Sequence, residues 1–564
     1  MAALPPPASH GLLGRLPRGT YASPAADARI SSDGPISDTT DMATAASTTG
    51  IDPSAKGVPA WLGYLSALAV FVVFAAHGGW QVPDVNEAHY LTKARHYWEP
   101  DWAARDFFLN SADSHKVFFV TLGWLGTLVS FDAFAWIGRL LTWGLLAAAF
   151  YRLCASLRLR NWYAPLAAAL FVALNSRFAL AGEWVIGGFE AKGIAYAAVL
   201  WAIERFILKK WNQALIVLGV ATAFHVLVGG WSAIALGFAW LRLGRDRPSL
   251  ISLWTGLLVS AILALPALIF AVSLNWGVDA DTIDRANRIY VFGRLAHHLL
   301  PSYFGEQAWL RIGLLWVVWG MLGWRLRNDQ EISRLRGFVN GAVLIAIVGA
   351  LIFLATRGNG SLNAAWMRYY WFRLADFALP LGVALLAVHW AIRLNPGPTG
   401  RRILLSALTL VAAASLADDV QRHFHAEQAP SDSPRRVADY AAWRDVCRWA
   451  RKNTSPDALF LTPRLTQTFK WFAERAEVVN LKDVPQDAIN IVEWWQRLAS
   501  VNRVLLPSGE RLWLDSLTQQ SPEKLRQIAK TYQVDYLITD CEPKLDLEQI
   551  YSNNSYAVYR LPHD

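Results

Sequence analysis

The sequence contains little cysteine and little charge for its length. Its 564 residues include only 3 cysteines, too few for a disulfide framework. Only 17% of the residues are charged, against about a quarter in soluble domains, which argues against a wholly soluble protein. The sequence has no P-loop, CxxC pair, HExxH motif or internal repeat. It has instead 54% hydrophobic residues and 28 tryptophans, and indole rings favour membrane interfaces.

The positive charge is spread along the chain. The net charge of +9 comes from 53 basic and 44 acidic residues, and the basic residues lie between apolar blocks. This pattern is typical of positive loops beside a membrane, so no nucleic-acid partner is predicted. Residues 1–60 are rich in Ala, Pro, Ser and Thr without a helical or strand period, which predicts a disordered cytoplasmic tail. We do not expect them to be a signal peptide, because the first apolar block begins near Trp61.

Residues 61–418 form a series of apolar blocks, each long enough or nearly long enough to cross about 30 Å of hydrocarbon. They predict eleven membrane spans, near 61–79, 134–156, 162–181, 190–208, 212–228, 230–243, 250–273, 309–325, 337–356, 371–392 and 403–417. The block 117–131 is shorter and has no basic flank at its far end. We interpret it as a re-entrant or interfacial helix.

The basic loops decide the orientation. With the N-terminus in the cytoplasm, every strongly basic short loop falls on the cytoplasmic side, as the positive-inside rule requires. The long loops 80–116 and 274–308 and the segment 430–564 are then external. In 430–564, strands predicted at Ala458–Thr462, Val478–Leu481, Val534–Thr539 and Tyr556–Leu561 alternate with helices. The predicted fold is a polytopic α-helical membrane protein with a C-terminal extracytoplasmic α/β domain, in which Cys447 and Cys541 either pair or stay free.

The first external loop concentrates the polar side chains that chemistry needs. It contains Asp84, Glu87 and Tyr90, then Asp106, and it ends at His115 and Lys116. One interpretation is structural, because Asp84 and Glu87 have the spacing of a capping box for a helix over 85–98. The other is catalytic, and the two can coexist.

This loop resembles the start of the GT-C superfamily of membrane glycosyltransferases, such as protein O-mannosyltransferases and aminoarabinose transferases. Those enzymes have one span, an external Asp-Glu-x-x-Tyr helix, a second acid, a lysine and then a span with an internal arginine. The matching residues here are Glu87, Tyr90, Asp106, Lys116 and Arg139. The chain departs from the pattern in two places: Asn86 stands at the position of the family's leading Asp, and Lys116 lacks the prolines that follow the family's lysine.

The resemblance implies an enzyme of a bacterial inner (plasma) membrane that moves a sugar from a polyprenyl-phosphate carrier to an external acceptor. Such a reaction needs a carboxylate as general base, and Asp84, Glu87 and Asp106 are the candidates. Which of them acts stays open, and Asn86 cannot, because an amide accepts no proton at neutral pH. Substrate-binding candidates in the same loop are Tyr90, His115 and Lys116.

Two further groups lie at predicted external span ends. Arg368, Arg373 and Asp376 are candidate substrate-binding residues, because ionisable groups at that depth are costly and often functional. Of these, Arg368 or Arg373 is expected to bind the carrier phosphate, because arginine grips two phosphate oxygens at once. The structural alternative is an i,i+3 pair of Arg373 with Asp376. Glu190 and Lys192 are also candidate substrate ligands, and the alternative for them is snorkelling at a helix end.

No cofactor is predicted. His297 and His298 share the 274–308 loop with three aspartates and could bind a divalent metal, but their spacing matches no specific site, so a metal is not favoured. The expected partners are membrane lipid and a polyprenyl-phosphate-linked sugar. The alternative functions are a transporter or flippase for a lipid-linked or anionic solute, and a non-catalytic receptor. A transporter is disfavoured because its site usually lies at the bilayer midplane between repeated halves.

Overall fold

The computed structural model describes residues 60–393, 397–505 and 511–561. Within it, Pro59–Asp564 form one compact unit. The tail predicted for residues 1–60 lies outside the described residues, except that Ala60 begins the first helix.

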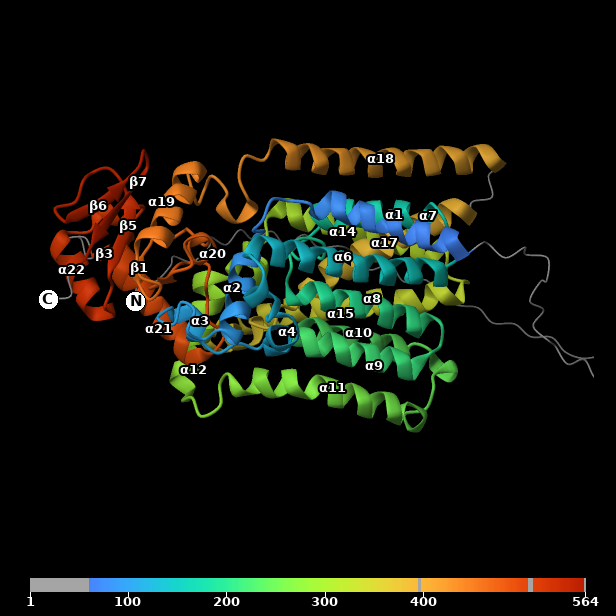
Figure 1. Ribbon diagram of the computed structural model, residues 1–564. Helices are drawn as coiled ribbons and strands as arrows, with labels where there is room; N and C mark the ends of the chain where they lie inside the picture. Colours follow the sequence, from blue (N-terminus) through green and yellow to red (C-terminus); the bar gives the residue numbers. More distant parts are fainter. Residues whose placement is uncertain (1–59, 394–396, 506–510, 562–564) are drawn as a thin grey trace, which may run out of the picture. The chain divides into compact units, whose positions relative to one another are not determined.

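Long helices run side by side through residues 60–425 (Figure 1). Six of them are long and apolar enough to cross a membrane: α1 (Ala60–Gly78), α6 (Phe131–Ser156), α11 (Trp254–Ser273), α15 (Gln330–Thr356), α17 (Arg373–Arg393) and α18 (Gly397–His425). The other predicted spans correspond to helices α7 (Tyr163–Arg177), α8 (Ala191–Ile207), α9 (Trp211–Phe224), α10 (Val226–Leu241) and α14 (Glu306–Arg325). The chain therefore has the helical, apolar build of an integral membrane protein, and a count of eleven crossings stays a prediction.

Burial separates the inner helices from the outer ones. In the most apolar stretch of α17, 83% of the residues are buried inside the protein, whereas in that of α11 only 17% are buried. In Figure 1, α11 and α18 lie on opposite flanks of the bundle. The exposed apolar side chains of α11 are what a helix in contact with lipid requires, since lipid tails do not penalise apolar surface.

The break between α9 and α10 falls four residues earlier than the predicted end at 228. Helix α9 ends at Phe224, and the His225 side chain caps α10 by accepting a hydrogen bond from the Val228 N–H at 3.3 Å. Gly229 is therefore inside α10, where an added Cβ would meet Thr222 of α9 at 2.3 Å. The glycine permits the close approach of two helices and is not their linker.

The segment 117–131 forms no long helix. It contains α4 (Lys116–Leu122, 7 residues) and α5 (Leu125–Leu128, 4 residues). Seven helical residues extend roughly 10 Å, a third of the hydrocarbon thickness. Both short helices pack against α2 (Glu87–Trp98), which the sequence predicted to begin two residues earlier.

The other short helices lie between the long ones or in the C-terminal part: α3 (Phe107–Asn110), α12 (Ala280–Arg288), α13 (Ala296–Leu299), α16 (Gly360–Met367), α19 (Tyr440–Asn453), α20 (Phe469–Ala473), α21 (Ala488–Asn502) and α22 (Pro522–Tyr532). A π-helical turn, Ile289–Arg294, follows α12. The strands are β1 (Leu459–Leu461), β2 (Ala476–Glu477), β3 (Arg503–Leu505), β4 (Arg511–Trp513), β5 (Tyr536–Asp540), β6 (Glu548–Ser552) and β7 (Tyr556–Arg560).

Five of the strands form a mixed sheet in the order β2-β1-β5-β7-β6, parallel from β2 to β5 and antiparallel beyond, and β3 and β4 form a hairpin. Alternate strand residues face opposite sides. Leu537 and Tyr559 pack toward α21 and α22, whereas Phe460, Ile538 and Val558 pack toward α19 and α20. The sheet is thus covered by helices on both faces, as an α/β arrangement requires.

One predicted strand was placed wrongly. Residues Val478–Leu481 are not a strand, and β2 pairs only through Ala476 and Glu477. The chain turns after them, because the Asn480 side chain accepts a hydrogen bond from the Asp483 N–H at 2.8 Å. Strands β3, β4 and β6 were not predicted.

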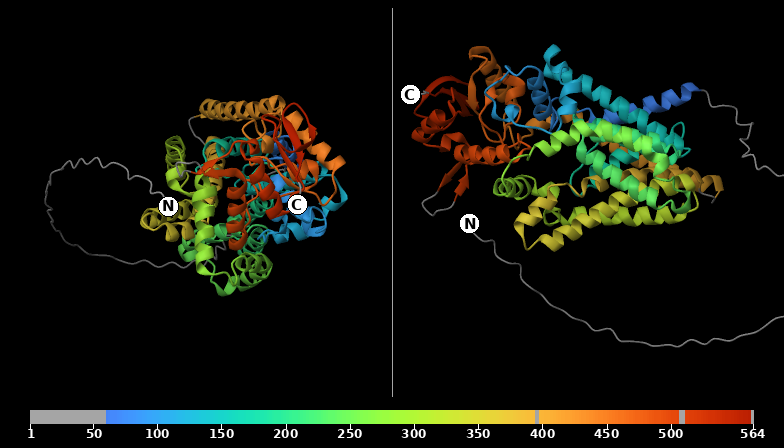
Figure 2. Two further views of the ribbon diagram at one scale, coloured as in Figure 1. Left: turned by 90° about the vertical axis from the view of Figure 1, so that its left-hand side faces the viewer. Right: turned by 90° about the horizontal axis from the view of Figure 1, so that it is seen from below.

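The sheet and the first loop lie beside one another at one end of the helix bundle (Figures 1 and 2). Ala103, Phe108 and Leu109 of the loop share an apolar cluster with α21 and α22. The three described cysteines, Cys154, Cys447 and Cys541, are free.

Candidate active site

A cavity of about 520 Å³ opens where the helix bundle meets the sheet. Its walls come from the first loop, the segment before α8, the α9–α10 break, residues 290–298, residues 368–373 and the C-terminal part of the chain. The segments that the sequence places on the external side therefore meet at one site. The orientation itself stays a prediction.

The predicted site residues divide into two groups. Six of them line the cavity: Tyr90, His115, Glu190, Lys192, Arg368 and Arg373. Five do not: Asp84, Glu87, Asp106, Lys116 and Asp376. All three carboxylates that were predicted as general bases are in the second group.

Glu87 forms a buried ion pair with Arg139. Its two oxygens accept hydrogen bonds from Arg139 Nε at 2.7 Å and Nη2 at 2.6 Å, and from the backbone N–H groups of Asp84 and Phe189. Glu87 is 1% exposed, and Arg139 is fully buried. A carboxylate with four donors has little capacity left for a substrate proton.

The predicted capping box is half formed. Glu87 does reach back to the Asp84 N–H, but Asn86, not Asp84, is the N-cap of α2. The Asp84 carboxylate instead accepts from the Val85 N–H at 2.6 Å and the Gly188 N–H at 2.7 Å. Asp84 thus ties the first loop to the segment that precedes α8.

Asp106 joins the first loop to the sheet. It caps α3 by accepting from the Leu109 N–H, accepts from the Glu477 N–H at 3.0 Å, and lies 3.3 Å from Lys470 Nζ. The same lysine pairs with Glu477 and Asp483, and all four side chains are buried. This network fixes the sheet against the loop.

Lys116 and Asp376 also point elsewhere. The Lys116 ammonium lies 4.9 Å from the centre of the Phe270 ring on α11. Asp376 is fully buried and accepts from the backbone N–H groups of Leu180 and Ala181, each at 2.8 Å. It makes no ion pair with Arg373 among the residues that the structure describes, so the i,i+3 pair weighed from the sequence is absent there.

Glu190 is the one carboxylate among the described residues that line the cavity. It lies at the N-cap of α8 and is 4% exposed. Its oxygens accept from Asn86 Nδ2 at 3.0 Å and Trp184 Nε1 at 3.2 Å, and Lys192 Nζ lies 3.7 Å away. The cations that line the same space are Lys192, Arg294, Arg368, Arg373, Arg436 and Lys482.

Asn86 connects two charges of opposite sign. Its Nδ2 donates to Glu190, and its Oδ1 accepts from Lys482 Nζ at 2.5 Å. An amide can donate and accept at once, whereas an ionised carboxylate only accepts. The departure from the GT-C pattern at Asn86 is thus matched by a lysine from the sheet side of the cavity.

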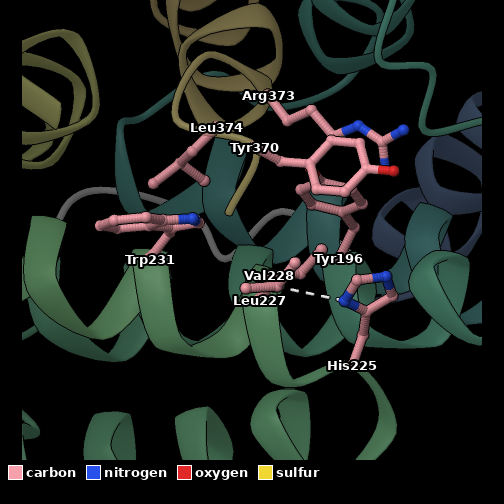
Figure 3. Close-up of a pocket in the computed structure, with 8 residues that line it drawn as sticks. All are labelled: Tyr196, His225, Leu227, Val228, Trp231, Tyr370, Arg373 and Leu374. Atoms are coloured by element: carbon pink, nitrogen blue, oxygen red, sulfur yellow. Dashed lines mark hydrogen bonds between the residues drawn. The ribbon is translucent and has the colours of Figure 1, made fainter. Parts of the chain in front are cut away.

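Arg373 lies at the start of α17 beside a small apolar recess of the cavity wall (Figure 3). Its guanidinium stacks on the Tyr370 ring at 3.8 Å and pairs with buried Glu183 at 3.2 Å. The recess is closed by Trp231 and Leu374. A cation next to an apolar recess can hold an anionic group whose neighbouring atoms are apolar.

Two histidines in the cavity wall are each paired with an aspartate. His89 Nδ1 lies 2.9 Å from Asp483 Oδ1, and His115 Nδ1 lies 2.9 Å from Asp113 Oδ1. Burial lowers the pKa of His89 despite its partner. Burial would raise the pKa of Asp113, but Lys93 and His115 outweigh it and lower the pKa overall. Burial would likewise raise the pKa of Asp483, but Lys470 and His89 outweigh it and lower the pKa overall. Both aspartates therefore stay charged and orient their imidazoles.

Sequence reasoning missed the cavity residues His89, Arg294, Arg436 and Lys482. Arg436 and Lys482 belong to the C-terminal part, 320 or more positions after the first loop, which ends at residue 116. No local pattern marks such a pairing. Among the residues with described positions, no group of three or more His, Cys, Asp or Glu side chains is placed to hold a metal ion.

Part of the chain matches a known family model. Residues 441–501 match a domain of unknown function (DUF6798). No curated protein matches the sequence.

Several solved structures are similar to this chain. The apo oligosaccharyltransferase of Archaeoglobus fulgidus has a TM-score of 0.48 and 12% identity, over 85% of this chain and 69% of that one. ArnT from Cupriavidus metallidurans, bound to undecaprenyl phosphate, has a TM-score of 0.44 and 14% identity, over 89% and 98%. The arabinofuranosyltransferase AftD from Mycobacteria has a TM-score of 0.46 and 14% identity, over 90% and 42%.

The resemblance to GT-C glycosyltransferases that the first loop suggests stays a prediction. Because the identities are 14% or less and the TM-scores lie below 0.5, the similarity assigns no role to any residue of this chain.

Proposed function

We propose that the protein is a membrane glycosyltransferase that moves a sugar from a polyprenyl-phosphate carrier to an acceptor hydroxyl on the external face. The observation that supports this most is the composition of the cavity, in which Glu190 is the one described carboxylate among six cations. A single base surrounded by phosphate-binding groups is what the transfer of a sugar from a phosphate requires.

Glu190 is proposed as the general base. It would accept the proton of the acceptor hydroxyl while that oxygen bonds to the anomeric carbon of the sugar. The bond from the anomeric carbon to the phosphate oxygen breaks at the same time, and its electron pair stays on the phosphate. One displacement inverts the anomeric configuration. Asp84, Glu87 and Asp106 keep the structural roles that their contacts indicate.

Arg373 and Lys192 are proposed to hold the departing phosphate. Both lie at the bundle end of the cavity, at the starts of α17 and α8. Glu183 lies 3.2 Å from Arg373 and 3.8 Å from Lys192, so it keeps the two cations together. A polyprenyl chain would leave from there along the apolar helices. Arg368, held by Asn287 at 2.5 Å, extends the positive wall.

The proposed location is a bacterial inner membrane, with the N-terminus in the cytoplasm and the cavity on the external face. No cofactor is assigned a role, because acid–base and phosphate-binding groups are supplied by the chain. The donor is proposed to be a polyprenyl-phosphate sugar, and the acceptor carries a free hydroxyl.

The test is label transfer by the purified full chain in sealed vesicles. Undecaprenyl phosphate carrying a radiolabelled hexose or pentose is mixed with a cell-envelope extract as acceptor. We expect the label to move from the lipid to the aqueous phase with release of undecaprenyl phosphate. Label that crosses the membrane while still attached to the lipid would support the transporter alternative instead.

The role of Arg373 is tested by Arg373→Gln, with Arg357→Gln as a control because Arg357 is exposed in the loop before α16. Loss of a charge-assisted phosphate contact costs about 1.5–3 kcal/mol, so affinity for undecaprenyl phosphate should fall by about tenfold to a hundredfold. Unchanged affinity would remove Arg373 from the phosphate site.

A further inference from the structure

Three cations at the sheet end of the cavity have only neutral hydrogen-bond partners. Arg294 Nε donates to the Leu481 carbonyl at 2.9 Å, and Lys482 Nζ donates to the Asn86 amide. Arg436 Nη1 donates to the Pro430 and Ser431 carbonyls at 3.3 and 2.9 Å. Within residues 60–393, 397–505 and 511–561, none of the three cations forms an ion pair with a carboxylate.

Two cations at the bundle end differ in this respect. Lys192 and Arg373 both pair with Glu183, and Lys192 lies close to Glu190 as well. Their charge is therefore partly offset by the chain itself. Among the described residues, Arg294, Arg436 and Lys482 form no ion pair, and Asp432, Asp483 and Glu190 act on them only from beyond ion-pair distance. Arg368 of the bundle end also has a neutral partner, the Asn287 amide.

The three cations repel one another. Burial and then the charges of Arg294 and Arg436 lower the pKa of Lys482 to about 7. Burial and Arg436 also lower the pKa of Arg294. Half-buried like charges without an anion are costly, and a bound anion would remove most of that cost.

We propose that Arg294, Arg436 and Lys482 form an anion subsite that holds a phosphate, sulfate or carboxylate group of the acceptor. That the three cations bind an anion does not depend on the proposed function. That the anion belongs to the acceptor does rest on it. This inference extends that function by naming the acceptor class, a hydroxyl compound that also carries a negative charge.

The placement of the subsite favours the acceptor over the donor. Arg436 and Lys482 come from the segments that follow α18, away from the helices that would receive a polyprenyl chain. Asn86 links Lys482 to Glu190, so a molecule held at the subsite lies next to the proposed base. Its hydroxyl can then reach Glu190 while the donor phosphate lies at Arg373.

The test measures binding of two probes to the full chain by calorimetry in nanodiscs. Inorganic sulfate probes the subsite, and undecaprenyl phosphate probes the donor site. The variant Arg294→Gln/Arg436→Gln should weaken sulfate binding at least tenfold and change undecaprenyl-phosphate affinity less than twofold. Arg435→Gln is the matched control, because Arg435 is exposed next to Arg436, and it should change neither affinity.

Two outcomes would overturn the proposal. Sulfate affinity that survives the double substitution would show that the three cations do not form the subsite. An equal loss of both affinities would show that they bind the donor, for example a second phosphate of a diphosphate carrier. Neither measurement needs sugar transfer, so a chain that binds sulfate without transferring sugar would refute the proposed function and leave the subsite standing.

A second readout uses the proton of Lys482 and does not depend on the double variant folding. Sulfate stays fully ionised at pH 8, so any proton taken up when it binds must be bound by a group of the protein. We expect uptake by the wild type at pH 8, and its loss in Lys482→Arg, which is charged throughout. The charged and titratable groups that act on Lys482 or respond to it are Arg294, Arg436, Glu190, Asp483, His89 and His297. Sulfate binding without proton uptake in the wild type would contradict the role of Lys482.

Discussion

Asn86 Nδ2 lies 3.0 Å from Glu190 Oε2, so an amide of the first loop donates a hydrogen bond to the carboxylate that precedes α8. The other end of the same amide accepts from Lys482. In Asn86→Asp the new carboxylate would face Glu190 without a proton to donate. Losing this contact should raise the activation free energy of sugar transfer by about 1.4 kcal/mol or more, so turnover should fall about tenfold or further.

The matched control for this substitution is Asn110→Asp, which adds the same charge at an exposed position of the same loop. Sugar-transfer rates of both variants are compared with the wild type. Full turnover by Asn86→Asp would mean that the link between Asn86 and Glu190 does not matter for the reaction.

Glu87 and Arg139 should determine stability. In Glu87→Gln, the buried Arg139 guanidinium loses its counter-charge, which costs roughly 3–5 kcal/mol. We expect a lower melting temperature and lower yield in detergent. Glu99→Gln is the control, because Glu99 is partly exposed and its partner Arg95 keeps a second carboxylate in Glu474, and such an i,i+4 pair contributes about 0.5 kcal/mol or less. A Glu87→Gln variant that melts like the wild type but transfers no sugar would restore Glu87 as a catalytic residue.

Asp432 makes stability depend on pH. Burial raises the pKa of its carboxyl to about 7, although Thr468 donates a hydrogen bond to it at 2.7 Å. The stability that a protonated Asp432 contributes is present in full below its unfolded-state pKa of about 4 and is lost as the pH rises through about 7.

The neutral isostere Asp432→Asn should remove that loss. We expect it to stabilise the protein at pH 8 by on the order of 2–4 kcal/mol and to have little effect at pH 4. Thermal unfolding at the two pH values measures the difference. An equal effect at both would show that the charge of Asp432 is unimportant.

Hydrophobic blocks and basic loops predicted the positions of the long helices, because lipid exposure demands continuous apolar stretches whatever their neighbours are. The exact ends depended on contacts that a single sequence does not reveal. The α9–α10 break at His225 is an example, since it needs a side-chain cap and the approach of Gly229 to Thr222.

The site was predicted less well than the helices. Acidic residues of the first loop pointed to a segment that lines the cavity, but the sequence could not tell which carboxylates already had partners. Glu87 is taken by Arg139, and Asp106 by Lys470. Glu190, predicted as a substrate ligand and not as a base, is the carboxylate that lines the cavity, because the fold brings it next to Asn86, 104 positions away.

The predicted orientation places the cavity outside the cell. Cysteines introduced at Asn110 and at Leu208 should report opposite sides of the membrane. A membrane-impermeant maleimide should label the first in intact cells and the second only after permeabilisation. The partly exposed native Cys541 should be labelled like position 110. The reverse pattern would place the cavity in the cytoplasm.

The most direct test of the account is the sugar-transfer rate of Glu190→Gln, which keeps the shape of the side chain and removes its ability to accept a proton. We expect turnover to fall about a hundredfold or more, the size of a lost general base. Undecaprenyl-phosphate affinity should stay within twofold, because Glu190 does not hold the phosphate. Wild-type turnover by this variant would contradict the claim that Glu190 is the base.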